Sequence, residues 1–144
     1  MESGKPSLGF KINKIETEQF AVIEEAFLEN EKVLFNYGFS FGTDQKLKII
    51  GAFASFRFLT NDKPFLILKA GCYFSTSDDL WDSLKIKDSN QLKLNKDFLC
   101  HLMMIAVGTS RGILHAKTEN TLFNKFVIPT LNIEESIKED MIIE

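Results

Sequence analysis

The chain has 144 residues, a net charge of −3 at pH 7 and an isoelectric point of about 5.5. This length fits one domain (1–144) that buries roughly two-thirds of its unfolded surface. The acidic balance argues against a nucleic-acid binder, which normally carries a concentrated basic face, and we find no apolar run of the ~20 residues that a membrane span needs.

The first ten residues carry one lysine and no apolar core, so we expect no signal peptide. Cys72 and Cys100 are far apart in apolar surroundings. They are typical of free, buried thiols in a reducing compartment, and we expect neither a disulfide nor a metal set. The protein is therefore predicted to be cytoplasmic.

Alternating apolar and polar residues predict a run of strands after a flexible tail at 1–8. The expected strands are 10–24, 33–42, 46–59 and 65–75. The alternation shifts phase at Lys14 and Ile15, which predicts a bulge in the first strand. Because successive strands are joined by short loops, we expect an antiparallel sheet.

Helices are expected after the strands. A capped helical turn should carry Trp81, and a polar loop should follow at 85–93. A long helix should begin at Asn95, whose side chain can cap it. One face of this helix should hold the apolar residues that recur every three or four positions, namely Phe98, Leu102, Ile105, Thr109 and Ile113.

The end of the chain alternates between extended and helical signals. Pro129 forces 126–128 to be extended, whereas Ile133, Ile137 and Met141 at helical spacing predict a short terminal helix. Strands followed by helices predict an α+β domain: about four antiparallel strands, with a long helix and a short C-terminal helix on one face. The uncovered face is then expected to meet another subunit or a partner.

The strongest alternating signal is an aromatic stripe of four residues in the second strand. It consists of Phe35, Tyr37, Phe39 and Phe41. The stripe has two interpretations. It can be the core face of the sheet under the helix, or an apolar groove for extended, non-native chains.

No residue set predicts catalysis. His101 and His115 are the two histidines, and neither has a carboxylate or thiol at useful spacing for a metal or a catalytic pair. We therefore expect no enzyme activity, no metal and no cofactor. Arg111, flanked by Ser110 and Gly112, can hold carbonyls or a carboxylate in a fixed geometry, which predicts a structural role toward a loop or a neighbouring subunit.

Four segments, in this order, resemble the SecB-like chaperone family, which includes the SecB-type export chaperones and the SecB-like chaperones of toxin–antitoxin systems. FKINKIETEQF (10–20) is similar to the first strand of that family, and LKAGCYFS (68–75) to its fourth. Ser110-Arg111-Gly112 and IPTLNI (128–133) are similar to a Ser-Arg-Gly at the end of the long helix and to a proline-containing segment after it.

The resemblance implies a nucleotide-independent holdase that binds unfolded or nascent polypeptides, in export or for a dedicated client such as an antitoxin. It also implies a homotetramer built as a dimer of dimers, with clients lying in grooves between the sheet and the loop 113–133. The implied client-binding residues are Phe35, Tyr37, Phe39, Phe41, Phe53, Phe56, Phe58, Trp81, Phe123, Phe126, Ile128 and Leu131. The implied oligomer or structural residues are Gly108, Ser110, Arg111, Gly112, Pro129 and Asn132.

The chain departs from the family pattern in two places. The segment ILHAKTENTLF (113–123) is an insertion that should lengthen the helix or the groove loop. Gln19 stands where the export chaperones tend to carry an acid that docks the translocase ATPase, and Glu16, Glu18 and Glu24 are the substitutes nearby. The alternative to a holdase is an interaction or scaffold protein that uses the same surface for one fixed partner.

Overall fold

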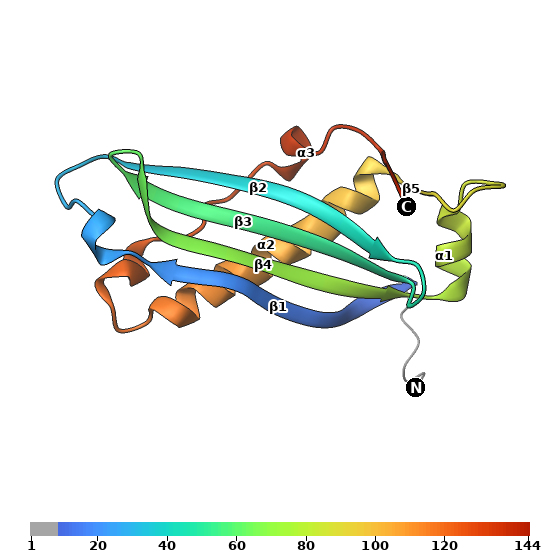
Figure 1. Ribbon diagram of the computed structural model, residues 1–144, viewed down its shortest axis with the longest axis horizontal. Helices are drawn as coiled ribbons and strands as arrows, with labels where there is room; N and C mark the ends of the chain where they lie inside the picture. Colours follow the sequence, from blue (N-terminus) through green and yellow to red (C-terminus); the bar gives the residue numbers. More distant parts are fainter. Residues whose placement is uncertain (1–8) are drawn as a thin grey trace.

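The computed structural model describes residues 9–144 and shows one four-stranded antiparallel sheet with a long helix across one of its faces (Figure 1). The expected tail, 1–8, lies outside the described residues. The sheet strands are β1 (Phe10–Val22), β2 (Val33–Asp44), β3 (Ile49–Thr60) and β4 (Lys63–Thr76), in the order β1-β4-β3-β2. The predicted α+β class and antiparallel sheet are confirmed.

The first strand lies beside the fourth, so β1 and β2 form the two edges of the sheet. The 3-10 helix η1 (Glu24–Ala26) and the turn after it carry the chain across the end of the sheet. The register of β1 shifts between Ile12 and Lys14, next to the predicted bulge, and again between Thr17 and Gln19. Two bulges bend and twist this edge, which makes it a poor template for indiscriminate strand pairing.

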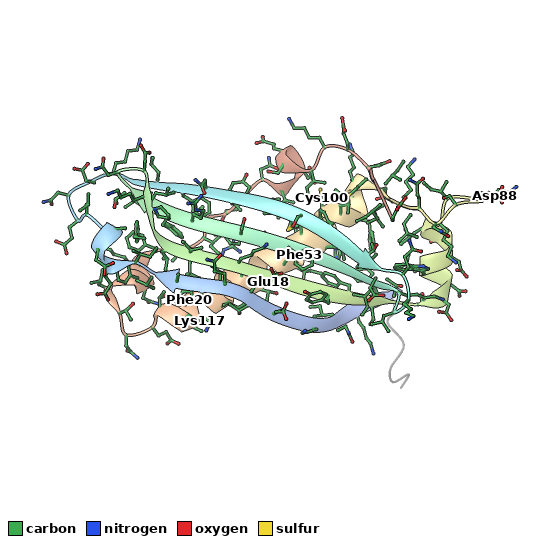
Figure 2. The ribbon with its side chains drawn as sticks, in the orientation of Figure 1. Glu18, Phe20, Phe53, Asp88, Cys100 and Lys117 are labelled. Carbon is green, nitrogen blue, oxygen red and sulfur yellow. The ribbon has the colours of Figure 1, made fainter. Side chains whose placement is uncertain are left out.

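The long helix α2 (Lys96–Thr118) packs on β3 and β4. The Asn95 side chain caps it as predicted, because its Oδ1 accepts from the Phe98 N–H at 2.9 Å. The helix runs unbroken through Gly108 and Gly112. It also extends into the insertion, where Lys117 Nζ lies 5.4 Å from the centre of the Phe20 ring of β1 (Figure 2).

The predicted apolar face of α2 is rotated from the face that is buried. Among the five residues named for it, Leu102 is buried and the other four lie at its margin. The buried positions are Leu99, Cys100, Leu102, Met103, Ala106, Val107, Ser110, Leu114 and Thr118. These side chains meet the inward residues of β3 and β4, which form one hydrophobic core with them.

Short elements close the ends of the domain. They are α1 (Asp78–Leu84), which carries the buried Trp81, β5 (Leu92–Leu94), η2 (Leu122–Lys125), α3 (Ile133–Ser136) and β6 (Met141–Ile143). The predicted terminal helix is limited to α3. Ile137 and Met141 lie beyond it in extended chain, because β6 pairs antiparallel with β5. Strand β5 overlaps the end of the predicted polar loop, 85–93.

Candidate functional site

The aromatic stripe of β2 lies on the face of the sheet that carries α2. Phe35 and Tyr37 are paired with Phe58 and Phe56 of β3, whose side chains belong to the core. Because β2 is an edge strand, the stripe is covered on its β3 side and partly open on the other, and Tyr37 is 40% exposed. Neighbouring rings touch along the strand, with centroids 5.9 Å apart for Phe35–Tyr37 and 5.1 Å apart for Tyr37–Phe39. The stripe therefore combines both sequence interpretations: it borders the core and offers apolar surface.

One wall beside the stripe is the segment after α2, residues 119–132, which we call the crossover. Figure 1 shows it passing behind the sheet from the end of α2 to α3, beside β2. Its Phe126 ring lies 5.0 Å from Phe65 and 5.7 Å from Phe58, which anchors it to the sheet. The Arg111 guanidinium fixes it to the helix.

The contact of Arg111 with the crossover uses two nitrogens at once. Its Nε donates to the Ile128 carbonyl at 2.8 Å, and its Nη2 donates to the Pro129 carbonyl at 2.9 Å. A lysine ammonium cannot hold two carbonyls in this planar arrangement. Arg111 thus binds a loop of its own chain, which is one of the two structural roles considered from the sequence.

The second wall is the segment Ser136–Glu144, which we call the strap. Between the strap and β2 lies a cleft of about 620 Å³, lined by Phe39, Phe41, Leu99 and residues 136–142. A cleft of this size falls within the range of small-ligand or side-chain pockets. Two of its lining features, Leu99 and the strap itself, were not anticipated as part of a site from the sequence.

Most of the other residues predicted to bind clients have no free surface in this structure. Phe56, Phe58, Trp81, Phe123 and Ile128 are buried in the core. A client cannot reach them unless the core opens. Phe126 and Leu131, on the crossover, are half-buried and border the open part.

Phe53 does not belong to the same groove. It lies on the opposite face of the sheet, the one turned to the viewer in Figure 2, away from α2. Its ring rests flat on Gly51 and Gly71, since a Cβ built on either glycine would come within 2.6 Å of the ring. The ring meets Tyr73 edge-on at 5.5 Å. Phe53 therefore covers bare backbone on this face, and no single groove contains it together with the stripe.

The residues predicted for oligomerisation are divided between the outside and the inside of the helix. Gly108 and Gly112 lie on the outer side of α2, where a Cβ would meet no atom within 4 Å. Ser110 is buried, and its Oγ donates to the Ala106 carbonyl at 2.8 Å. Pro129 and Asn132 are exposed on the crossover. The glycines thus leave the outer helix surface low and free of side chains.

Two of the three carboxylates predicted to dock a partner are paired with lysines on the open face of the sheet. Glu16 lies 3.2 Å from Lys14 Nζ and accepts from the Tyr73 hydroxyl, and these contacts hold its pKa below the usual range. Glu18 lies 3.5 Å from Lys69 Nζ. Glu24 stands apart, in η1. The described face is therefore mixed in charge rather than acidic.

The histidines do not converge. His101 packs edge-on to Phe10 at 5.7 Å, whereas His115 faces Asn124, with 3.4 Å between its Nδ1 and the amide nitrogen. Within residues 9–144, no three His, Cys, Asp or Glu side chains come together as a metal site would require.

A scan against models of known protein families finds no match, and a search of curated proteins finds none either. Among solved structures, the chain is similar to the SecB-like chaperone Rv1957 of Mycobacterium tuberculosis, solved in complex with a ChAD peptide from the HigA1 antitoxin Rv1956. The alignment covers 87% of this chain and 93% of that one, with a TM-score of 0.50 and 9% identity. The fold is SecB-like. At this identity, the likeness is one of fold.

In this SecB-like fold, α2 is also long and apolar enough, by length and composition, to cross a membrane, so the expectation that no run reaches this length is wrong. Its apolar window is 44% buried inside the structure, against β3 and β4. The apolar character of α2 is accounted for by its packing on β3 and β4.

Proposed function

We propose that this chain is a cytoplasmic holdase of the SecB-like family, without enzyme activity or cofactor, which binds unfolded polypeptides in extended form along β2. The observation that carries the proposal is the half-open aromatic stripe of an edge strand, flanked by the crossover and by a cleft, on a SecB-like fold. Aromatic rings supply contact area without demanding a particular sequence, and an unpaired strand edge supplies backbone hydrogen bonds.

The driving force is the burial of apolar client surface, about 25 cal/mol per Å². In the absence of nucleotide, release must come from a partner or from folding of the client. A dedicated client such as an antitoxin fits the same proposal, because the structural neighbour was solved with an antitoxin peptide. Docking to a translocase ATPase has weaker support, because Glu16 and Glu18 are engaged by lysines.

The proposal includes a dimer of dimers, with no membrane insertion. Ile12 and Ile15 are half exposed along the β1 edge, and Met104 is exposed on the outer side of α2 beside the bare glycine strip. Apolar surface of this kind is typical of surfaces that meet another subunit. A mass measurement in solution tests this part, and a monodisperse monomer would contradict it.

The central experiment replaces two rings of the open stripe, Tyr37→Ser and Phe39→Ser together. We expect circular dichroism and thermal melting to show a folded protein that no longer suppresses aggregation of a chemically denatured test protein, followed by light scattering. Leu47→Ser is the control, because Leu47 is exposed in the turn between β2 and β3, away from the stripe. Full protection by the double variant would show that the groove assignment is wrong.

The same cleft also suits a scaffold protein with one fixed partner, because its lining is local and well defined. Binding of several unrelated denatured proteins at micromolar concentrations favours the holdase. Strict selectivity for one peptide favours the scaffold.

A further inference from the structure

The strap runs alongside the second half of the aromatic stripe and in the same direction. At its beginning, the Ser136 and Tyr37 hydroxyls lie 3.1 Å apart. At its end, the Thr43 hydroxyl donates to the Glu144 carbonyl at 2.8 Å. From Tyr37 to Thr43 a strand rises about 20 Å, which nine residues of strap span with slack. The strap is therefore tied at both ends over Phe39 and Phe41.

The strap also presents client-like chemistry to the groove. Ile137 and Met141 are half-buried against the core, while Ile142 points outward and is 59% exposed. The backbone of the strap is extended, and β6 within it pairs with β5. Asp140 accepts from the Lys96 N–H at 2.9 Å, at the positive end of α2, and lies 3.7 Å from Lys93 Nζ.

The strap is held by the short β5–β6 pairing, by the half-buried Ile137, Met141 and Ile143, and otherwise by exposed polar contacts. Both end contacts and the Asp140 contact with Lys96 lie at the surface, and both members of the Lys93–Asp140 pair are more than two-fifths exposed. Exposed hydrogen bonds and ion pairs contribute little net stability because water competes for them. Segments held in this way open locally long before the whole fold does.

We propose that the strap is an internal occupant of the Phe39–Phe41 end of the groove, and that a client binds there only after the strap has lifted. This rests on the holdase proposal and adds a regulated entrance to it. The strap covers apolar surface when no client is present, and a client that buries more apolar area displaces it.

Two cysteines let strap opening be measured without any client. The Cys100 thiol, labelled in Figure 2, is 7% exposed, and its sulfur lies 3.7 Å from the Ile137 carbonyl oxygen of the strap. Cys72 is 1% exposed on β4, inside the core. Lifting the strap uncovers Cys100, whereas uncovering Cys72 requires loosening of the core.

The first experiment releases the strap with Thr43→Val and Asp140→Ala and follows iodoacetamide labelling of each cysteine by mass spectrometry. Thr130→Val with Glu135→Ala is the matched control, because it removes the same groups from exposed positions outside the strap. We expect several-fold faster labelling of Cys100 in the released variant only, with Cys72 unchanged. An unchanged Cys100 rate, or equal acceleration of both cysteines, would overturn the proposal.

The second experiment measures binding of reduced, carboxymethylated α-lactalbumin, a permanently unfolded protein. Apparent affinity scales with the fraction of molecules whose site is open, so we expect the released variant to bind about three- to tenfold more tightly than the wild type. Equal affinity would mean that the strap does not block client binding, which overturns the strap proposal but not the holdase proposal. Weaker binding would make the strap a wall of the site, which also overturns the proposal. Absence of binding in every form, including the released variant, would contradict both the holdase proposal and the strap proposal.

Discussion

The crossover and the strap both lie beside β2 on the helix side of the sheet, but they are held there by different forces. The crossover buries Phe123 and Ile128 in the core and is clamped by Arg111. The strap buries no side chain completely and is held by hydroxyl contacts, by Asp140 and by the three-residue pairing of β6 with β5. The crossover is anchored by fully buried side chains, and the strap is anchored by half-buried ones and a short strand pairing.

This difference separates the permanent wall of the groove from its movable one. Full burial of an aromatic or branched side chain contributes several times the net free energy of an exposed hydrogen bond. A client that competes with the crossover must break the core, whereas a client that competes with the strap displaces surface contacts, a three-residue strand pairing and half-buried side chains. The end of the groove near Phe39 and Phe41 is therefore the end that can change its accessibility.

The largest effect should come from removing a buried anchor of the crossover. Phe123→Ala leaves a void among Phe27, Phe65 and Phe126, so we expect a loss of about 3–5 kcal/mol in the free energy of unfolding, measured with urea. The neighbouring Leu122→Ala is the control, because Leu122 is 56% exposed and its removal should cost less than about 0.5 kcal/mol. Equal losses in both variants would mean that the crossover is not anchored through Phe123.

A smaller loss is expected from the clamp itself. Arg111→Lys keeps the charge but cannot donate to the Ile128 and Pro129 carbonyls together, which should lower the free energy of unfolding by about 1–2 kcal/mol. Amides of residues 126–128, 130 and 131 should exchange faster in the variant. Arg57→Lys, at an exposed position of β3, provides the comparison and should change neither quantity. Unchanged exchange in Arg111→Lys would show that burial alone holds the crossover.

Local patterns made much of the fold predictable. Period-two alternation marks β2, β3 and β4 because side chains on a strand point to opposite faces, and Asn95 marks the start of α2 because its side chain satisfies a free N–H. The aromatic stripe was placed on one face for the same reason. The alternation does not indicate which strands are neighbours in the sheet. The position of β1 beside β4 therefore could not be predicted from it.

The strap shows where local patterns fail. Ile137 and Met141 fit helical spacing, but Met141–Ile143 forms a strand because β5 provides a partner in a stretch that looked like a polar loop. Tertiary pairing outweighs a weak local preference in so short a segment. Likewise, ten of the twelve candidate binding residues are aromatic, but aromatic identity could not tell Tyr37, which is open, from Phe56, which faces the core.

A still smaller effect on global stability is expected for the strap, together with a clear local one. Thr43→Val removes the hydroxyl that donates to the Glu144 carbonyl, at little change in shape. We expect the free energy of unfolding to change by less than about 0.5 kcal/mol, while amides of residues 137–143 exchange measurably faster. If those amides exchange only as fast as the whole protein unfolds, in both forms, then the strap is as firmly built in as the crossover.

The finest distinction is the pH dependence of the two thiols. Burial, with help from Glu134 and Asp97, raises the pKa of Cys100, and burial raises the pKa of Cys72. Since the thiolate is the reactive form, both labelling rates should rise at a higher pH than for a free thiol. The part of the free energy of unfolding that depends on the neutral thiols should be lost as pH rises through the raised pKa values of the two cysteines. In Thr43→Val/Asp140→Ala, the profile of Cys100 should move toward the ordinary thiol range while that of Cys72 stays in place. A profile of Cys100 that does not move would mean that burial by other parts of the fold and the carboxylates Asp97 and Glu134, and not the strap, control the pKa of this thiol.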